Sequence, residues 1–358
     1  MSIFHCNTRS LPKNLNLLND ILLTLKIPPD IIAISETKLN ENTPDNIAIP
    51  GYTFLGTNSQ TNAGGVGLYI SENIVFVRRQ DLEVSANSLE SCFIKVQRRK
   101  HKNMIIACIY RHPHNNCVEF QDMLRDKLDH INNLGLEALI AGDININFLN
   151  CNSDKFTSEY LDMLLNLVYM PVITKATRIT EHTATLIDHM YTKLPENLIS
   201  SGICASDISD HLPCFCIMSS KLSYGQQPRF FTDFSNFNNN LFTEELNMID
   251  FMSNIDIMDI NKSMNNIINT LQEITNKHAP MYQKTSNREK RQMKKPWISN
   301  CILVSIRRKQ KMFKTHYLSR DPDKIKDYKI YSNNLNKIKQ IARKQIFGIT
   351  IRNEQREH

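Results

Sequence analysis

The sequence predicts an α/β fold in which helices cover a sheet, and two observations support this. Between Ile3 and about Ile217, short apolar runs of strand length alternate with polar turns and with segments whose apolar residues recur every three or four positions. The chain has 358 residues, of which 41% are hydrophobic, so it can form one large domain or two ordinary ones, each with its own core. This alternation is typical of a sheet packed against helices.

Eight short apolar runs predict strands, and three longer stripes predict helices. The strands are expected at Ile31–Ser35, Val66–Ile70, Ile74–Val77, Cys92–Val96, Met104–Tyr110, Ala138–Ala141, Leu186–Met190 and His211–Ile217. The helical stripes consist of Leu15, Leu18, Leu22 and Leu25, of Phe120, Leu124, Leu128 and Ile131, and of Tyr160, Leu161, Leu164 and Leu167. A spacing of three or four puts each stripe on one face of a helix, which can then pack on a sheet.

The glycine-rich stretch Gly64–Gly67 predicts a turn into the strand at Val66–Ile70. A phosphate-binding loop is the competing interpretation. However, no helical pattern follows the stretch, and the Lys-Ser/Thr pair of such a loop is missing.

Past Ser220 the composition changes, which predicts a domain boundary near residue 220. We expect an α/β domain over residues 1–220, a partly helical, Asn-rich connecting segment over 221–293, and a basic helical extension over 294–358. The extension begins at Lys294–Trp297. Its apolar residues that fall near one helical face predict an ordinary packing face; they are Ile325, Tyr328, Leu335, Ile338 and Ala342.

The net charge of +7 is distributed unevenly along the chain. Residues 281–358 contain 21 Lys/Arg and 6 Asp/Glu, a net charge of +15, whereas residues 1–280 contain 22 and 30, a net charge of −8. An acidic body with a basic tail suggests a carboxylate-rich site on one part and a phosphate-attracting surface on the other. The alternative is a solvated Lys-rich helix without a ligand.

Apolar segments and cysteines indicate the compartment. No window approaches the roughly 20 uninterrupted apolar residues of a membrane span, and Met1–Arg9 lacks the order of a secretory signal. The nine cysteines include no CxxC pair and no framework spacing of small secreted proteins. We therefore expect a soluble intracellular protein whose cysteines are reduced core thiols.

Polar residues stand at the ends of several apolar runs, where an α/β scaffold places its functional groups. Glu36 follows Ile31–Ser35, and Asp143 follows the run that ends at Gly142. The pair Asp188 and His189 follows Leu186 and Ile187, and the pair Asp210 and His211 opens the run toward Phe215. A buried carboxylate without a partner is costly, so each needs a metal ion or a hydrogen bond. We expect these carboxylates and one histidine to converge on a single cleft.

This set of groups suits the hydrolysis of a phosphodiester, which needs a cation, an aligned water and stabilisation of the leaving oxygen. Hard carboxylate ligands such as Glu36 and Asp210 favour Mg²⁺ over zinc. Asp143 can orient or deprotonate the water, and an Asp–His pair holds an imidazole in a defined tautomer. Taken singly the signals are weak, because an Asp-His dipeptide or a lone Asn7 or Tyr110 usually has a structural role.

The order of the motifs carries more information than any one of them. The chain contains Cys6-Asn7-Thr8-Arg9-Ser10-Leu11, Ile34-Ser35-Glu36-Thr37, Gly64-Gly65-Val66-Gly67, Tyr110-Arg111-His112-Pro113, Ala141-Gly142-Asp143-Ile144-Asn145, Leu186-Ile187-Asp188-His189 and Ser209-Asp210-His211-Leu212-Pro213. Seven motifs in this order over about 215 residues resemble the endonuclease/exonuclease/phosphatase superfamily, which includes apurinic repair endonucleases and the endonucleases of non-LTR retrotransposons.

The resemblance implies a fold and a set of roles. The fold is a four-layered α/β sandwich of two packed mixed sheets flanked by helices, here with the basic helical extension. Glu36 would be the principal ligand of Mg²⁺, for which Mn²⁺ could substitute, with Asp210 and Asn7 beside it. Tyr110 and Asn145 would contact the scissile phosphate, and Asp143 would align or deprotonate the water. His211, oriented by Asp188, would stabilise charge on the phosphoryl oxygens.

Two features favour the retrotransposon branch of the superfamily. The Asn-x-Arg-Ser-Leu opening at Asn7–Leu11 is typical of it, and the basic segment at Lys295–Ile298 is similar to the region that connects nuclease to reverse transcriptase there. No Tyr/Phe-x-Asp-Asp polymerase motif occurs in the chain, so we expect a truncated element, a fragment or a derived host gene. In place of the more usual Arg-Pro-Pro run, His112-Pro113-His114 follows Tyr110 and Arg111.

The resulting hypothesis is a nuclear, monomeric enzyme that nicks double-stranded DNA and does not bind membranes. The expected nucleic-acid contacts are Arg9, Arg111, Arg178, Arg307, Arg308 and Lys309, with element RNA as a further partner of the basic extension. Two alternatives stay open. One is a phosphatase of the same fold acting on a lipid or small phosphoester. The other is a non-catalytic fragment that binds nucleic acid through Arg307, Arg308, Lys309, Lys311 and Lys314.

Overall fold

The computed structural model describes residues 1–39, 47–59, 63–86, 88–99, 101–180, 182–219, 221–223, 229–232, 237–250, 260–284, 297–317 and 321–354. The chain divides into two compact units. Met1–Gly225 together with Arg291–His358 form the first, and Gln226–Lys290 form the second. The basic extension, expected as a segment of its own, thus groups with the α/β domain. Lys294 to Pro296, where the extension was expected to begin, lie outside the described residues.

The first sheet of the larger unit has six strands. In spatial order these are β13 (Leu198–Ile203), β14 (Cys214–Met218), β1 (Ser2–Asn7), β2 (Ile31–Ser35), β4 (Val66–Ser71) and β3 (Tyr52–Thr57). β1 and β2 pair in parallel, and the other neighbours are antiparallel. The sheet is therefore mixed.

The second sheet also has six strands. Their spatial order is β5 (Phe76–Arg78), β6 (Glu90–Val96), β7 (Met104–Tyr110), β8 (Glu137–Asp143), β12 (Asp188–Thr192) and β9 (Met170–Pro171). β7 and β8 are parallel, and the other neighbours are antiparallel. A short hairpin of β10 (Arg178–Ile179) and β11 (Ala184–Thr185) stands apart from both sheets.

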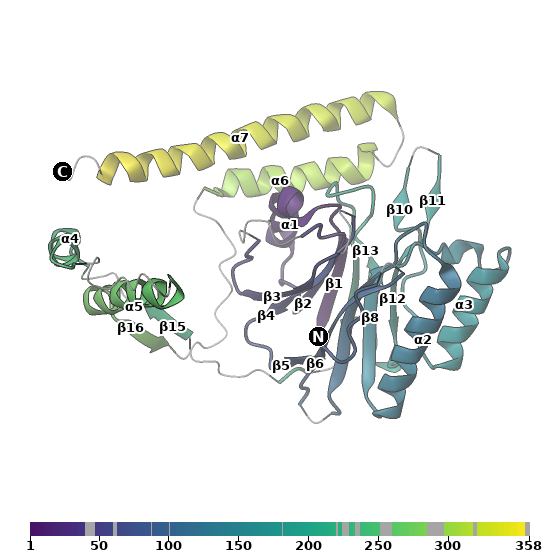
Figure 1. The fold of residues 1–358 in the computed structure, drawn as a ribbon. Coiled ribbons are helices and arrows are strands. Elements are labelled where there is room, and N and C mark those ends of the chain that lie inside the picture. Colours follow the sequence, from purple (N-terminus) through teal and green to yellow (C-terminus); the bar gives the residue numbers. More distant parts are fainter. Residues whose placement is uncertain are drawn as a thin grey trace. The chain divides into compact units, whose positions relative to one another are not determined.

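Side chains that alternate along β2 show how the layers stack. Ile31 and Ala33 belong to the core between the sheets, whereas Ile32 and Ile34 pack in the cluster with α1 (Leu11–Thr24), because successive side chains of a strand point to opposite faces. The outer face of the second sheet is covered by α2 (Cys117–Asn133) and α3 (Lys155–Asn166) (Figure 1). The predicted stripe of α2 is buried, whereas in α3 Tyr160 and Leu164 are buried and Leu161 and Leu167 only partly. The four-layered sandwich of two mixed sheets flanked by helices is confirmed.

Polar residues fix where the two outer helices begin. The Asn116 side chain accepts hydrogen bonds from the backbone N–H groups at the start of α2, and Asp154 accepts from Thr157 N at the start of α3. Such caps satisfy donors that have no partner within the helix. The short 3₁₀ turn η1 (Phe148–Asn150) lies between these two helices, and a second one, η2 (Pro195–Asn197), lies in the connection from β12 to β13.

The observed bounds of some strands agree with the predicted ones, and those of others differ. β2 and β7 have the expected bounds, and Gly64 and Gly65, with φ of 117° and 83°, form the expected turn into β4. β12 begins at Asp188, not at Leu186, and β14 begins at Cys214, not at His211. The sequence pattern does not predict the edge strands β3 and β13, whose partly exposed faces carry polar residues.

The C-terminal extension forms two helices with a buried seam. α6 (Asn300–Met312), which Ser299 caps, continues through a π-helical turn, η4 (Phe313–Tyr317), and is followed by α7 (Pro322–Glu354). Tyr328 and Leu335 of the predicted stripe are buried, but Ile338 is exposed, so the packing face is narrower than expected. None of the described helices is long and apolar enough to cross a membrane.

The smaller unit combines a hairpin and two helices. β15 (Arg229–Thr232) pairs antiparallel with β16 (Met281–Lys284), and the helices are α4 (Asn239–Asn247) and α5 (Ile260–His278). Glu245 of α4 pairs with Lys277 and His278 of α5. All nine cysteines of the chain are free, and most are buried as expected, although Cys301 is exposed.

Candidate active site

Strand ends from both sheets meet at one rim and bring the predicted polar residues together. Asn7 is the last residue of β1, Glu36 follows β2, and Asp143 is the last residue of β8. Asp188 is the first residue of β12 and lies opposite Asp143 in the antiparallel register. Antiparallel pairing places the start of one strand beside the end of its neighbour. Asp143 at the end of β8 and Asp188 at the start of β12 therefore lie at the same rim.

The Asn7 amide joins two carboxylates. Its Nδ2 atom donates to Oε1 of Glu36 at 2.8 Å and to Oδ2 of Asp143 at 2.7 Å. Its Oδ1 atom accepts from the backbone N–H of Arg9 at 3.0 Å, so both ends of the buried amide are used. Because an amide offers two donors on one nitrogen, it can hold two acceptors close without adding a charge.

A second pair lies next to this group. Nδ1 of His211 is 2.9 Å from Oδ2 of Asp188 and 4.0 Å from Oδ2 of Asp143. Ser209 fixes the loop that carries His211, because its Oγ donates to the Asn7 backbone oxygen at 2.8 Å and accepts from His211 N at 3.2 Å. Oγ1 of Thr177 accepts from the backbone N–H of Asp188 at 3.0 Å. The imidazole is thus held at both its ring and its backbone.

The electrostatics of the buried groups follow from these contacts. Burial lowers the pKa of His211, but Asp188, Asp143 and Asp210 outweigh burial and raise it to about 9. Burial, followed by the charge of Asp188, raises the pKa of Asp143 to about 8. Burial also acts to raise the pKa of Asp188, but His211 outweighs it, and the net shift is downward. At neutral pH the imidazole is therefore charged and paired with Asp188.

Tyr110 and Asn145 border the same group. The buried Tyr110 has a raised pKa because of burial and the nearby charges of Glu36, Asp143 and Glu90, so its hydroxyl stays protonated. The backbone N–H of Asn145 donates to Oδ1 of Asp143 at 3.3 Å. The Nδ2 atom of Asn145 donates to the Arg111 backbone oxygen at 2.7 Å, which fixes the side chain.

Three residues around the rim adopt a backbone conformation that is uncommon for residues other than glycine. The φ angles are 52° at Arg9, 50° at Glu36 and 54° at Asn145. This left-handed region costs free energy for most side chains and tends to occur at functional sites. At each of these positions a strand has just ended, and the turn redirects the chain at the rim.

The family comparison agrees with this geometry. The sequence profile of the Endonuclease/Exonuclease/phosphatase family matches residues 4–211. The chain belongs to this family. The match spans all the residues described above, from Asn7 at the end of β1 to His211. No curated protein sequence matches the chain.

Three solved structures illustrate what the chain is similar to. The catalytic domain of Xenopus laevis APE2 is 14% identical with a TM-score of 0.52, covering 63% of this chain and 94% of that one. The AP endonuclease LMAP from Leishmania major is 12% identical with a TM-score of 0.50, covering 61% and 87%. The endonuclease domain of TRAS1, a telomere-specific non-LTR retrotransposon, is 10% identical with a TM-score of 0.47, covering 61% and 97%.

The residues of this family site fit a hard divalent cation. Atoms of Glu36, Asp143 and His211 that could act as ligands lie within 4.8 Å of one another. A charged imidazole does not coordinate a metal, so the donors of this cluster that remain are the carboxylate oxygens of Glu36 and Asp143. Such oxygen donors suit a hard divalent cation.

Asp210 is placed differently from the prediction. Instead of joining the cluster of Glu36, Asp143 and His211, it is paired with two arginines. Arg9 Nε is 2.9 Å from Oδ1, and Arg178 Nε is 2.7 Å from Oδ2. Burial acts to raise the pKa of Asp210, but Arg178, His211 and Arg9 outweigh it and lower it. In this arrangement two guanidinium groups compensate the charge of the carboxylate.

The expected nucleic-acid contacts separate into exposed and buried groups. The side chains of Arg9 and Arg178 are 49% and 37% exposed at the rim. Arg307 and Arg308 are exposed on α6. Arg111 is buried, and its guanidinium donates to the backbone oxygens of Ile144, His112, Asn115 and Asn145. The assignments of Arg111 and Lys309 to nucleic acid need correction, because Lys309 is also buried and bonds Asp207.

Glu90, a buried carboxylate beside the site, is not among the residues that the sequence predicts for it. Its oxygens accept from the backbone N–H of Gly65 at 2.5 Å and from Ser59 Oγ, and they lie 3.1 Å from Nε2 of His112. His112 in turn contacts the ring of Tyr110, with the centroids 4.8 Å apart. Its signal in the sequence is weak, because Glu90 is a single glutamate at the start of an apolar run. Two of its partners, Gly65 and His112, belong to two other motifs.

Proposed function

We propose that this chain is a divalent-metal-dependent phosphodiesterase that cuts DNA as an endonuclease. The observation that supports it most directly is the grouping of two carboxylates on the Asn7 amide beside the Asp188–His211 pair. A general base, a cationic hydrogen-bond donor and hard metal ligands within one rim are what phosphodiester hydrolysis needs.

Each residue has a role in this proposal. Glu36, with Asp143 and Asn7 beside it, would hold a cation such as Mg²⁺, which when bound neutralises phosphate charge. Burial raises the pKa of Asp143 to about 8, and a cation bound beside it would lower that pKa again and keep the carboxylate ionised. The ionised Asp143 orients the attacking water and accepts its proton, and its own orientation is fixed by Asn7 and Asn145. The charged ring of His211, held by Asp188, donates to a phosphoryl oxygen as negative charge builds there. The protonated hydroxyl of Tyr110 supplies a further donor.

The charge distribution favours DNA as the substrate. Arg9 and Arg178 lie exposed at the rim, next to Asp210, and Arg307 and Arg308 are exposed on α6. A phosphate backbone presents repeated negative charges that such separated cations can contact together, whereas a small phosphoester occupies only the rim. Element RNA is a further candidate for the exposed residues of the extension, and we expect a monomeric, nuclear enzyme.

We assign the enzyme to the non-LTR retrotransposon type on the basis of the opening motif. The residues of Asn7–Leu11 make different contacts from one another. Asn7 bridges the carboxylates, Arg9 pairs with Asp210, and the fully buried Leu11 begins α1 in the core. One five-residue segment thus links the site, the rim and the core.

The experiment that tests the proposal is nicking of supercoiled plasmid by the purified chain with Mg²⁺ and with EDTA. The parent should nick in Mg²⁺ only, Asp143→Asn should lose at least about a hundredfold in rate, and the exposed control Asp126→Asn should not change. A folded chain that binds the plasmid without nicking it would identify the non-catalytic binding fragment. Release of phosphate from a phosphoinositide, with no nicking, would identify a phosphatase.

A further inference from the structure

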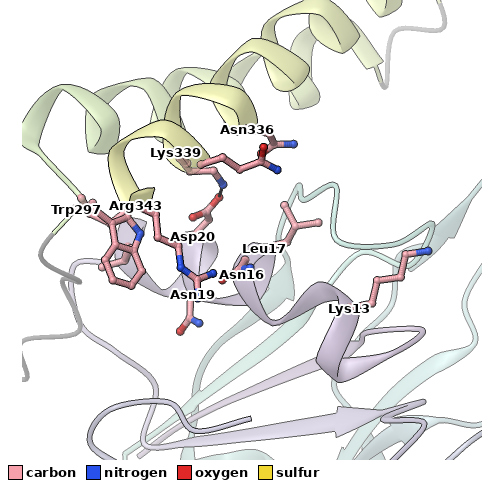
Figure 2. A pocket seen from close by; sticks show the side chains of 12 residues that line it. Lys13, Asn16, Leu17, Asn19, Asp20, Trp297, Asn336, Lys339 and Arg343 are labelled. Carbon is pink, nitrogen blue, oxygen red and sulfur yellow. Dashed lines mark hydrogen bonds and ion pairs between the residues drawn. The ribbon is translucent and has the colours of Figure 1, made fainter. Parts of the chain in front are cut away.

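The C-terminal extension is docked on the family domain over a continuous seam. Ile298, Ile302, Ile306 and Leu335 form a buried cluster to which Leu23 of α1 contributes. Close by, the Lys339 ammonium of α7 lies 2.5 Å from Oδ2 of Asp20 in α1. A cavity of about 300 Å³ lies between α1 and the extension. Figure 2 shows the ion pair and the Trp297 and Arg343 side chains, which line this cavity.

A second contact area of the extension lies at the loop before His211. Oδ2 of Asp207 accepts from Nζ of Lys309 at 2.9 Å and from the Tyr328 hydroxyl at 2.5 Å. One carboxylate oxygen therefore joins α6 and α7 to a residue three positions before Asp210 and four before His211. Lys309 is only 1% exposed, and a buried ammonium is stable only when it is paired.

Apolar packing surrounds this contact on both sides of the catalytic loop. Leu212, Phe313 and Tyr328 form a buried cluster against which Ile179 and Ala205 pack. Leu212 is the neighbour of His211, and Ile179 is the neighbour of Arg178, which bonds Asp210.

The backbone completes the connection between the two segments. The N–H of Leu212 donates to the Thr177 oxygen at 2.6 Å, and Arg178 forms a bridge with His211. Thr177 also accepts the backbone N–H of Asp188, the partner of His211. A displacement of the Phe313 cluster would therefore reach both Asp188 and His211 through a few hydrogen bonds.

We propose that α6, η4 and α7 form a positioning element of the enzyme, in which Lys309, Phe313 and Tyr328 hold the loop of Asp210 and His211 in its productive place. None of the three contacts substrate in this scheme. They act through Asp207 and Leu212, and the extension is required for turnover as well as for any phosphate contact of its exposed face. The expected effect on rate rests on the proposed function. The positioning of the loop by these three residues does not depend on it.

The test uses the full chain and a matched pair of variants. Phe313→Ala removes a buried side chain from the cluster at the catalytic loop, and Leu335→Ala removes one from the other cluster of the same helices. Tyr328→Phe removes only the hydroxyl on Asp207 and keeps the ring, so it serves if Phe313→Ala does not fold. Trp297 is the only tryptophan of the chain, and its emission reports whether the extension stays docked.

The first readout is backbone hydrogen exchange of residues 177–179 and 206–212, which does not require activity. Phe313→Ala and Tyr328→Phe should speed exchange there by roughly fivefold to tenfold, about the loss of one buried hydrogen bond. Leu335→Ala should speed exchange within α6 and α7 and leave these two segments unchanged. Unchanged exchange in the two segments for both loop-side variants overturns the proposal.

The second readout separates positioning from simple stabilisation. In plasmid nicking well below the unfolding temperature, Phe313→Ala should lower kcat by roughly tenfold to a hundredfold, because a shift of about 1 Å in a catalytic group has effects of this size. KM for DNA should stay within about twofold. Equal kcat in Phe313→Ala and Leu335→Ala also overturns the proposal. A parent chain that hydrolyses no phosphodiester refutes the proposed function alone, and hydrogen exchange then decides the positioning role.

Discussion

Asp188 holds Nδ1 of His211 at a distance of 2.9 Å, with both side chains buried at the junction of the two sheets. The carboxylate keeps the ring oriented with Nε2 turned away from it. Burial lowers the pKa of the imidazole, but the charge of Asp188, together with those of Asp143 and Asp210, outweighs burial and raises this pKa to about 9. Both effects depend on the negative charge of Asp188 and not on its shape alone.

Asp188→Asn should therefore abolish most of the activity while leaving the fold intact. The amide is nearly isosteric but no longer stabilises a charged ring, and analogous changes in Asp–His pairs lower rates by roughly a hundredfold to ten thousandfold. The measurement is the nicking rate in Mg²⁺, with the exposed Asp126→Asn as control. Parental activity in Asp188→Asn would show that the pair has only a structural role.

Asn7→Asp should destabilise the chain in EDTA. The substitution replaces the donor shared by Glu36 and Asp143 with a third carboxylate, so two acceptors lose their partner, at a cost of roughly 1–3 kcal/mol in the free energy of unfolding. Thermal unfolding measures the loss, and exposed Asn150→Asp is the control. Equal stability of the two variants would mean that the Asn7 bridge contributes nothing.

A divalent cation should stabilise the parent chain and not Glu36→Gln. Binding to the folded state alone adds about 2.7 kcal/mol when the cation is a hundredfold above its dissociation constant. Unfolding temperatures with Mg²⁺ and with EDTA give the shift, and Glu119→Gln on the exposed face of α2 should keep it. If Glu36→Gln gains as much as the parent, the cation binds elsewhere.

Glu90→Ala should lower the free energy of unfolding by roughly 3 kcal/mol, because the Gly65 N–H, the Ser59 hydroxyl and His112 lose a buried acceptor together. Glu90→Gln retains one acceptor oxygen and should lose less. Chemical denaturation of the three chains gives the order. A similar loss in both variants would show that packing volume, and not hydrogen bonding, is the main contribution of Glu90.

The fold could be predicted where local pattern decides it. The buried strands β2 and β7 read directly from their apolar runs, because a strand covered on both faces has little choice of composition. β3 and β13 could not be found in this way, since an edge strand carries polar residues on its exposed side. The sharing of one rim by Asp143 and Asp188 depends on antiparallel pairing, which no local pattern shows.

The sequence predicts which residues form the candidate site better than it predicts which of them pair with one another. Asn7, Glu36, Asp143, Asp188 and His211 come together at the rim, but the pairing of Asp210 with Arg9 and Arg178 depends on loops far apart in the sequence. The burial of Lys309 could have been predicted from its spacing, although a count of charges does not show it. Lys309 shares a helical face with Ile302 and Ile306, so its spacing already indicates a buried position.

Buried His189 gives the chain an acid-sensitive step that is separate from catalysis. Its ring stacks on Phe148, with the centroids 3.9 Å apart, and Nε2 lies 2.9 Å from the Ile146 oxygen. Burial lowers its pKa from 6.5 to about 4. Between pH 6.5 and 4 the unfolded chain binds a proton on this ring and the folded chain does not. The free energy of unfolding therefore falls as the pH drops through this window, by up to roughly 3 kcal/mol from this residue.

His189→Phe should keep the stack on Phe148 and remove this share of the pH dependence. At pH 7.5 the variant should be less stable than the parent by about 1 kcal/mol, because the ring loses its hydrogen bond. At pH 4.5 it should be as stable as the parent or more stable, since it has no proton to exclude. His5, also buried with a pKa lowered by burial to about 4, retains its own share. Denaturation at both pH values tests this, with exposed His182→Phe as control. Parallel losses at both pH values would show that the His189 ring does not govern the acid limb.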